Sequence, residues 1–361
     1  MSVAIGALCR LLLPNKDKYN KDKRKQEYAK IHKIKLLEIW YWDYENINEI
    51  LIKELIKWGD KLFRIADYEI QSIHDEIDYV IPQSIKLTNV QTLWDKGYYG
   101  KGIHIAILDT GIDVNHVCLK DRIVETKNFI DGTDDVTDRQ GHGTHVSSII
   151  AANRTPKGIT GMAPESLLHI YKVLGDDGNG NMESIVKAIY HAIDMKVDII
   201  NMSLGGTTGN NALEVAIDKA IENNICVVCA SGNDARGDNG SKDEINFPGF
   251  YREVIEVGSV NKDNKMSYFS NSNDNVDLVA YGGNIMACYP GNKYAQCSGT
   301  SQATPQISGA LALLKQKFIA EFGRLPECES ELYAQLIKNT KTIPNVSRKL
   351  QGNGILYFIG E

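Results

Sequence analysis

The chain has 361 residues, of which 43% are apolar and 24% are charged, and its formal net charge is −6. A chain of this length and composition can bury one large core and an accessory segment, which excludes a disordered or fibrous protein. No apolar stretch is long enough to span a bilayer, so we expect no membrane-spanning segment.

Residues 1–85 form an N-terminal extension that begins with a basic run. The first forty residues carry ten Lys or Arg against four Asp or Glu, a local net charge of +6. Such a run is most often a solvated helix face. The more specific alternative is electrostatic docking of the run to the acidic remainder of the chain or to an acidic partner. Nucleic-acid binding would need exposed aromatic residues among the basic ones, whereas Trp40–Trp42 and Ile50–Leu62 are typical of the core of a helical hairpin. The sequence predicts a helical extension and no nucleic-acid binding.

The first residues do not have the layout of a secretion signal. Met1–Pro14 contains a short apolar run without a positive start, and the strongly basic stretch Asn15–Lys35 follows it, which is the reverse of the usual order. The seven cysteines show no framework pattern and fit reduced thiols better than disulfides. The predicted location is the cytoplasm.

Apolar strand-like runs alternate with helical stretches in residues 86–361, the predicted body of the protein. The predicted strands are Ile103–Leu108, Leu167–Val173, Val197–Leu204 and Ile225–Ala230, and the predicted helices are Val146–Ala152, Met182–Met195 and Asn211–Asn223. Strands that alternate with helices in this way indicate a mostly parallel sheet with helices on both faces. The predicted fold class is therefore α/β.

Three polar residues stand at the ends of these elements. Asp109 follows a buried strand, His142 lies in a GHGTH motif before an apolar helix, and Ser301 lies in a glycine-flanked turn that leads into another apolar helix. Taken singly, they are typical of a turn former, a helix cap and an N-cap serine. A serine nucleophile, however, needs a base within hydrogen-bond reach and a third group that orients the base. The order Asp, His, Ser is one in which such a triad occurs.

With these motifs, the sequence resembles the subtilisin-like serine proteases from Trp94 to Tyr357. The matching motifs are ILDTGID around Asp109, HGTH at His142, VDIINMSLGG in 197–206, ASGN in 230–233 and SGTSQATP around Ser301. The intracellular branch of the subtilisins is the most similar, on the stretches 81–111, 332–340 and 352–358. The resemblance implies a serine endopeptidase with Asp109, His142 and Ser301 as its triad and an acyl-enzyme at Ser301.

The resemblance also implies how the substrate is held. Asn233 and the backbone N–H of Ser301 would donate to the tetrahedral oxyanion. Two backbone walls would add strands to either side of an extended peptide; one consists of Ser203, Leu204 and Gly205, the other of Gly178, Asn179 and Gly180. Met182 and Ile185 would line an apolar pocket a few residues before the cut, and Asn246 would lie near the floor of the pocket for the residue at the cut. The expected specificity is broad, with a preference for large apolar or extended side chains.

The ligand patterns predict no metal site. Cys226 and Cys229 lie three apart in an apolar strand, where their side chains point to opposite faces. Secreted subtilisins commonly bind calcium through a carboxylate a few residues after the catalytic Asp, and Cys118 stands at that position here. The loop that would supply the other ligands is Asn153–Lys157, and it contains the positively charged residues Arg154 and Lys157. We therefore expect the usual calcium site to be lost. Calcium bound elsewhere, for example through Asp238, Asp243 or Glu244, stays open.

Intracellular members of the family carry an N-terminal segment that lies across the active site, with a proline that puts a peptide bond out of reach of the nucleophile. Arg64–Tyr68 lies at nearly the corresponding distance, with Asp67 in place of the proline. We expect a zymogen, kept latent by this extension and activated by removal of roughly the first 80 to 90 residues.

Three functions stay open at this point. They are a general protein-degrading endopeptidase, a dedicated protease that matures one peptide precursor, and an inactive relative that binds peptides. Intact Asp109, His142, Asn233 and Ser301 favour an active enzyme. The expected partners are polypeptide substrates, the chain's own N-terminal extension as an intramolecular inhibitor, and a second copy of the chain in a homodimer.

Overall fold

The computed structural model describes residues 62–65, 69–237 and 240–360, all of which belong to one compact unit that covers Lys61–Glu361. The predicted helical hairpin and basic run lie outside the described residues, as does Asp67.

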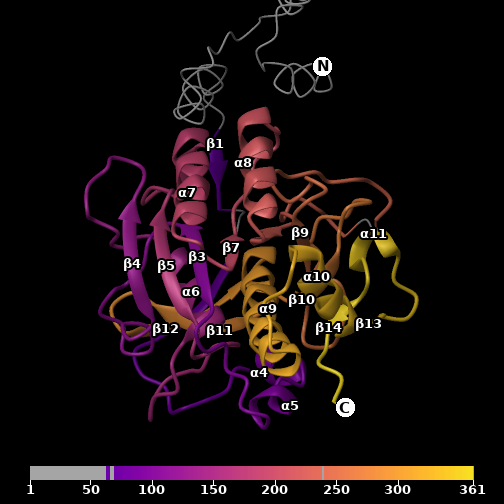
Figure 1. Cartoon of the computed structure of the whole chain (residues 1–361), viewed down its shortest axis with the longest axis horizontal. Coiled ribbons are helices and arrows are strands. Elements are labelled where there is room, and N and C mark those ends of the chain that lie inside the picture. Colours follow the sequence, from indigo (N-terminus) through magenta and orange to yellow (C-terminus); the bar gives the residue numbers. More distant parts are fainter. Residues whose placement is uncertain (1–61, 66–68, 238–239, 361) are drawn as a thin grey trace, which may run out of the picture. The chain divides into compact units, whose positions relative to one another are not determined.

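A nine-stranded sheet forms the centre of this unit (Figure 1). Its strands are β3 (His104–Asp109), β4 (Ile123–Asn128), β5 (Leu167–Lys172), β7 (Ile199–Met202), β8 (Cys226–Ala230), β9 (Ile255–Val260), β10 (Leu278–Tyr281), β13 (Thr340–Lys341) and β14 (Ile355–Leu356). The strand order is β13-β14-β10-β9-β8-β7-β3-β5-β4. All neighbours are parallel except β13, which is antiparallel to β14. The inner strands β7, β8 and β9 are buried at every residue, as expected for a sheet covered on both faces.

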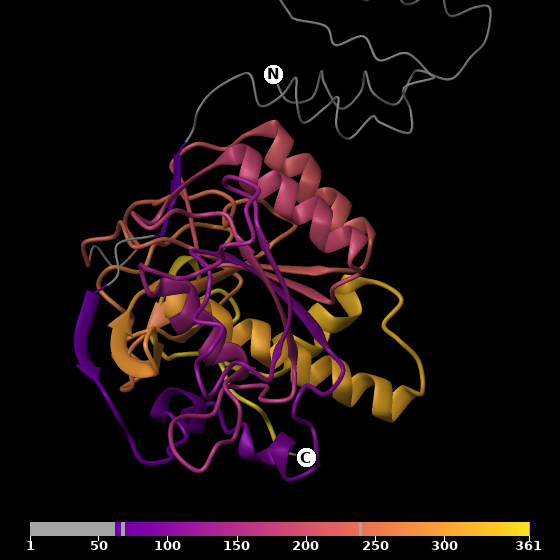
Figure 2. The same ribbon diagram turned by 90° about the vertical axis from the view of Figure 1, so that its left-hand side faces the viewer.

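Helices cover the two faces of the sheet. The longer ones are α6 (His142–Ala151), α7 (Met182–Asp194), α8 (Asn211–Glu222), α9 (Thr300–Phe322) and α10 (Glu329–Lys338), and the short ones are α4 (Gln83–Leu87), α5 (Gln91–Trp94) and α11 (Arg348–Gln351). Helices α7 and α8 pack together on one side of the strands, and α9 lies on the other side, where it contacts α6 (Figure 2). The predicted α/β fold is confirmed.

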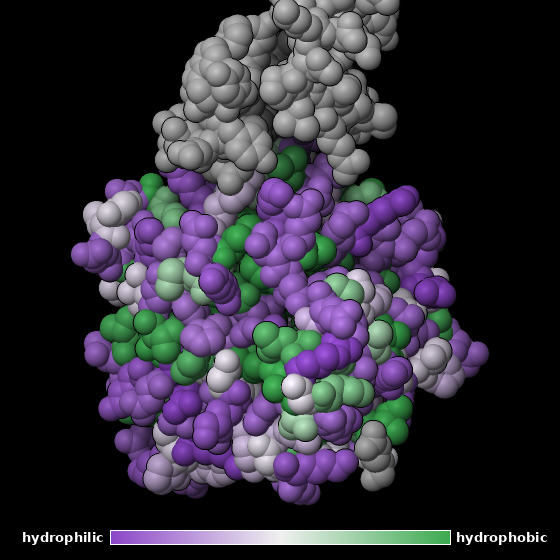
Figure 3. Space-filling view, in the orientation of Figure 1, coloured by the Kyte–Doolittle hydropathy of each residue, from purple (hydrophilic) through white to green (hydrophobic). Residues whose placement is uncertain are grey.

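The outer face seen in Figure 3 is mostly hydrophilic, with scattered apolar patches. Helix α7 illustrates how its apolar side chains are kept from this face. Its buried residues include Met182, Ile185, Val186 and Ile189, which recur at helical spacing and so form one stripe. Among the described residues, no helix combines the length and apolarity needed to cross a membrane.

Two small antiparallel sheets complete the fold. One joins β2 (Glu69–His74), β11 (Ile285–Tyr289) and β12 (Lys293–Ser298), and the other pairs β1 (Leu62–Arg64) with β6 (Asn179–Asn181). Strand β12 runs into α9 through Gly299 and so delivers Ser301 to the start of that helix. In its described part, the predicted extension thus forms two strands before α4 begins.

Candidate active site

Asp109 and His142 meet at the carboxyl end of the central sheet. Asp109 is the last residue of β3 and His142 the first of α6, and both side chains are fully buried. Asp109 Oδ1 lies 2.8 Å from His142 Nδ1 and also accepts the Thr110 N–H at 2.7 Å. A carboxylate at Nδ1 fixes the imidazole with its proton on that nitrogen, which leaves Nε2 as the basic atom.

A second buried carboxylate, Asp138, holds the loop between these two residues. Its Oδ1 accepts from Thr110 Oγ1 at 2.8 Å and from the Gly141 N–H at 2.7 Å. Its Oδ2 accepts from the N–H and the hydroxyl of Thr144 at 2.8 and 2.7 Å. Asp138 therefore ties the strand break after Asp109 to the first turn of α6. Asp138 was not among the residues predicted from the sequence, where its one signal is its place four positions before His142.

Ser301 is the second residue of α9. The first N–H groups of a helix have no intrahelical partner and lie at the positive end of its dipole, so the Ser301 N–H is suited to a developing negative charge. The Ser301 hydroxyl donates to the Ser203 carbonyl at 3.1 Å, and the Ser203 hydroxyl donates to the Ser301 carbonyl at 3.0 Å. These two bonds link the start of α9 to a residue of the predicted substrate wall.

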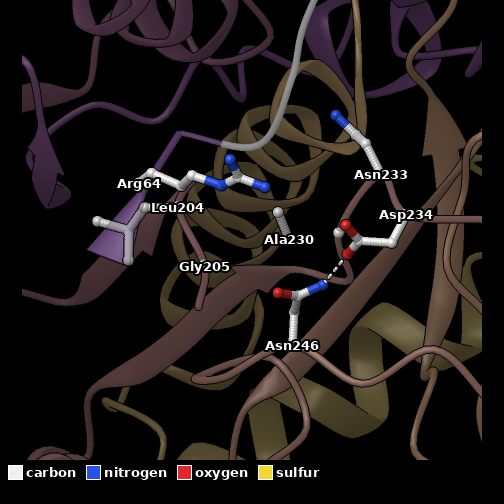
Figure 4. Close-up of a pocket in the computed structure, with 8 residues that line it drawn as sticks. Arg64, Leu204, Gly205, Ala230, Asn233, Asp234 and Asn246 are labelled. Carbon is white, nitrogen blue, oxygen red and sulfur yellow. Dashed lines mark hydrogen bonds between the residues drawn. The ribbon is translucent and has the colours of Figure 1, made fainter. Parts of the chain in front are cut away.

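Thr300 fixes the orientation of the Asn233 amide. Asn233 Oδ1 accepts from the Thr300 N–H at 2.9 Å and from its hydroxyl at 2.8 Å. With the oxygen engaged twice, the amide nitrogen must point the other way, and Figure 4 shows it on the side of Asn233 away from Asp234. The arrangement presents a positioned N–H donor at the pocket, as an oxyanion requires.

The chain's own residues 62–65 lie between the two predicted substrate walls. On one side of this strand, Arg64 and Gly205 exchange both backbone hydrogen bonds. On the other side, β1 pairs with β6, and Ile65 N–H donates to the Gly178 carbonyl at 3.1 Å. The walls therefore already enclose an extended strand, in the geometry by which a sheet edge takes up a peptide.

Phe63 carries the buried side chain of this strand. It pairs with Gly180, two residues before Met182, and its ring is 0% exposed. Met182 and Ile185 are buried as well, on the first turn of α7. Met182 and Ile185, which were predicted to line an apolar pocket, thus lie shortly after the wall residue Gly180 that pairs with Phe63.

Asn246 belongs to a pocket beside the oxyanion donor. The lining residues are Arg64, Leu204, Gly205, Ala230, Gly232, Asn233, Asp234 and Asn246 (Figure 4). Asp234 Oδ2 accepts from Asn246 Nδ2 and, at 3.2 Å, from Asn271 Nδ2. Gly232, at φ +107°, leaves room for these two amide groups, because a Cβ there would lie 2.4 Å from both Asn246 Nδ2 and Asn271 Nδ2. Asp234, an exposed carboxylate in this pocket, was not predicted from the sequence.

The residues at the position of the family's calcium site do not fit calcium. Cys118 offers a buried sulfur, 3.7 Å from Thr155 Oγ1, where a hard cation requires oxygen. The Thr155 hydroxyl donates to the Lys157 carbonyl, and the Arg154 guanidinium lies 5.1 Å from the Trp94 ring centroid. Of the other ligands that the sequence left open, Asp238 lies outside the described residues, Asp243 pairs with Lys349 at 2.8 Å, and Glu244 accepts from the Ser272 N–H.

Comparison with known proteins decides the family. The model of the "Subtilase family" matches residues 100–360. The chain belongs to this family. The "Intracellular serine protease" of Paenibacillus polymyxa is 45% identical over 303 residues, which cover 83% of this chain and 91% of that protein. The "Major intracellular serine protease" of Bacillus subtilis is 46% identical over 283 residues, covering 77% and 88%. "Subtilisin DY" of Bacillus licheniformis is 38% identical over 238 residues, covering 66% and 85%.

These matches confirm the resemblance to the intracellular branch and the prediction of a serine endopeptidase. This subtilase retains Asp109, His142, Asn233 and Ser301, the residues that the family motifs assign to its chemistry.

Proposed function

We propose that this subtilase is an active endopeptidase of broad specificity, kept latent by its own N-terminal segment. The observation that carries the activity is the buried 2.8 Å contact between Asp109 Oδ1 and His142 Nδ1. An inactive peptide-binding relative would have no use for a base oriented in this way, whereas acyl transfer by Ser301 depends on it.

The proposed chemistry gives each of these residues one role. The Ser301 hydroxyl turns from the Ser203 carbonyl to His142 Nε2, which takes its proton as Oγ attacks the peptide carbonyl. Asp109 stabilises the charged imidazole. The Asn233 amide and the Ser301 N–H hold the oxyanion. His142 then gives the proton to the leaving amine, and water repeats the sequence to release the acyl group.

Labelling with a fluorophosphonate probe tests this assignment. After removal of the N-terminal segment, the probe should modify the wild-type chain on the peptide that contains Ser301. Ser301→Ala should abolish labelling, while the control Ser298→Ala, on β12 three residues earlier, should retain it. A wild-type chain that takes no label, or a Ser301→Ala chain that still does, would refute the proposed nucleophile.

The proposed latency rests on the strand in the groove. Residues 62–65 make the main-chain bonds to Gly205 and Gly178 that a substrate would make, and they bury Phe63. A substrate must displace this strand, and because the strand belongs to the same chain, its effective concentration is high.

The proposed specificity rests on the mixture of contacts. Backbone walls accept many sequences, which supports broad cleavage. The apolar pocket suits a large side chain, and the carboxylate of Asp234 in the other pocket favours an extended side chain that ends in a positive charge. A dedicated maturation protease is the alternative, and a peptide library distinguishes it by a strict preference at several positions.

Cytoplasmic location is part of the proposal, supported by the names of the two intracellular relatives. The homodimer stays a prediction, which the mass of the intact protein in solution tests.

A further inference from the structure

Three buried side chains with metal-binding atoms meet beside the lost calcium position. His116 and Cys118 lie in the turn after β3, and Cys288 lies on β11. All three are 0% exposed, and their ligand atoms lie within 4.8 Å of one another. Neither the triad nor the substrate groove uses them, so their convergence calls for a separate explanation.

The spacing is close to that of a zinc site. With bonds of about 2.3 Å to sulfur and 2.0 Å to nitrogen, a tetrahedral zinc ion places its ligand atoms about 3.5 to 3.8 Å apart. The ligand atoms must therefore approach one another by at most about 1.0 to 1.3 Å, which rotation about the Cys118 and Cys288 χ1 bonds can supply.

His116 already has the outer contact that metal-binding histidines commonly make. Its Nε2 lies 3.1 Å from the Lys293 carbonyl, which can only accept, so Nε2 carries the proton and Nδ1 the lone pair. The Cys118 N–H now donates to Nδ1 at 3.2 Å. A metal ion on Nδ1 would replace this long contact.

Oxygen atoms for a fourth position lie nearby, and the backbone closes the site. Tyr294 Oη lies 3.6 Å from Cys118 Sγ, and Thr155 Oγ1 lies 3.7 Å from it. A Cβ on Gly158 would be 2.7 Å from the same sulfur, so the loop passes directly over it. A closed site of this kind is typical of a structural metal rather than a catalytic one.

We propose that His116, Cys118 and Cys288 bind a thiolate-preferring cation such as zinc, in place of the calcium used by secreted relatives. Sulfur and imidazole select zinc or copper(I) over calcium. Each cysteine thiol gives up its proton to the solvent when its sulfur binds the metal. The ion ties the turn after Asp109 to β11 and to the loop at Gly158, and so stabilises the loops beside the active site.

Cobalt titration of the reduced full-length Ser301→Ala chain tests the proposal without self-digestion. We expect one Co²⁺ per chain, a thiolate-to-cobalt charge-transfer band in the near ultraviolet, and displacement of the cobalt by Zn²⁺. Zinc should also raise the unfolding midpoint by several degrees, because it binds the folded chain. In urea the band should vanish, since unfolding separates Cys118 from Cys288.

Matched cysteine variants locate the site. Cys118→Ala and Cys288→Ala should each lose the band and the zinc-dependent stabilisation, while Cys226→Ala, which removes another buried thiol, should keep both. The proposal is overturned if the Ser301→Ala chain with all its cysteines gives no thiolate band, if the band survives Cys118→Ala or Cys288→Ala in that chain, or if it survives unfolding. A Cys118–Cys288 disulfide that persists under the reducing conditions would overturn it as well.

Discussion

Arg64 and Gly205 exchange two backbone hydrogen bonds, Arg64 N–H to the Gly205 carbonyl at 3.0 Å and Gly205 N–H to the Arg64 carbonyl at 2.8 Å. This is the pairing that an extended substrate would make with the wall Ser203–Gly205. The proposed regulation of this subtilase thus uses the same contacts as its proposed substrate binding.

Asp138→Ala should lower kcat by about a hundredfold while KM changes little. The substitution removes four acceptor contacts that hold Thr110, Gly141 and Thr144, and a displacement of about 1 Å at a catalytic group costs about that much. Steady-state kinetics on the trimmed enzyme measures it, with Asp135→Ala as the control because Asp135 is an exposed carboxylate of the same loop. Equal effects from the two variants would exclude a positioning role for Asp138.

Asn233→Ala should lower kcat by about a hundred- to a thousandfold, the magnitude known for the corresponding loss in a subtilisin. Thr300→Val should cost less, because it removes one of two bonds to Asn233 Oδ1 and leaves the amide in place. Circular dichroism should find both variants folded. A kcat within threefold of the wild type for Asn233→Ala would remove Asn233 from the oxyanion site.

Glu256→Gln should stabilise the protein at alkaline pH and leave its stability nearly unchanged below pH 4.5. Burial raises the pKa of Glu256 on β9 from 4.5 to about 8, although a hydrogen bond from Asn273 opposes the shift. The protonated carboxyl's contribution to stability is therefore fully present below pH 4.5, the unfolded value, and is lost as the pH rises through about 8. Urea unfolding of the Ser301→Ala chain across this range measures the difference, and the exposed Glu253→Gln should show no such trend. A difference that is constant with pH would contradict the burial argument.

Asp234→Asn should lower kcat/KM about fivefold for peptides with Lys at the cut and leave it unchanged for peptides with Leu. An exposed charge contributes at most about 1 kcal/mol to such a contact. Paired peptides that differ at this residue alone measure the ratio, with Asp263→Asn as an exposed control outside the pocket. An equal loss for Lys and Leu peptides would show that Asp234 has a structural role.

The fold could be predicted because a strand that is buried on both faces consists of consecutive apolar residues. Ile105–Leu108 in β3 is such a run. The start of α6 could not be predicted as well. The sequence predicted a helix from Val146, whereas α6 begins at His142, because Gly141, at φ 100°, lets the helix begin directly after the loop. Asp109, His142, Asn233 and Ser301 could be predicted as site residues because each lies in a motif of the family.

Other features depend on contacts that no local pattern encodes. Asp138 reads as an ordinary loop carboxylate, and only the folded loop surrounds it with donors. Cys118 and Cys288 are 170 positions apart, so the sequence predicted only the loss of a calcium ligand at Cys118, whereas the structure brings His116, Cys118 and Cys288 together. The family resemblance predicted that a segment beginning at Arg64 lies across the active site, but no local pattern in Leu62–Arg64 predicts the pairing of β1 with β6.

We propose above all that the strand around Phe63 occludes a competent Ser301. The most direct measurement is the initial rate of peptide cleavage by the intact chain, its length verified by mass, for the wild type, Phe63→Ala and the trimmed enzyme. We expect a latent wild type, a fully active trimmed enzyme and at least a tenfold gain in rate for Phe63→Ala, since truncating a buried Phe costs about 3 kcal/mol or more. Ile73→Ala, a half-exposed apolar residue of β2, should change little. A wild-type chain that cleaves as fast as the trimmed enzyme would show that the strand does not occlude Ser301.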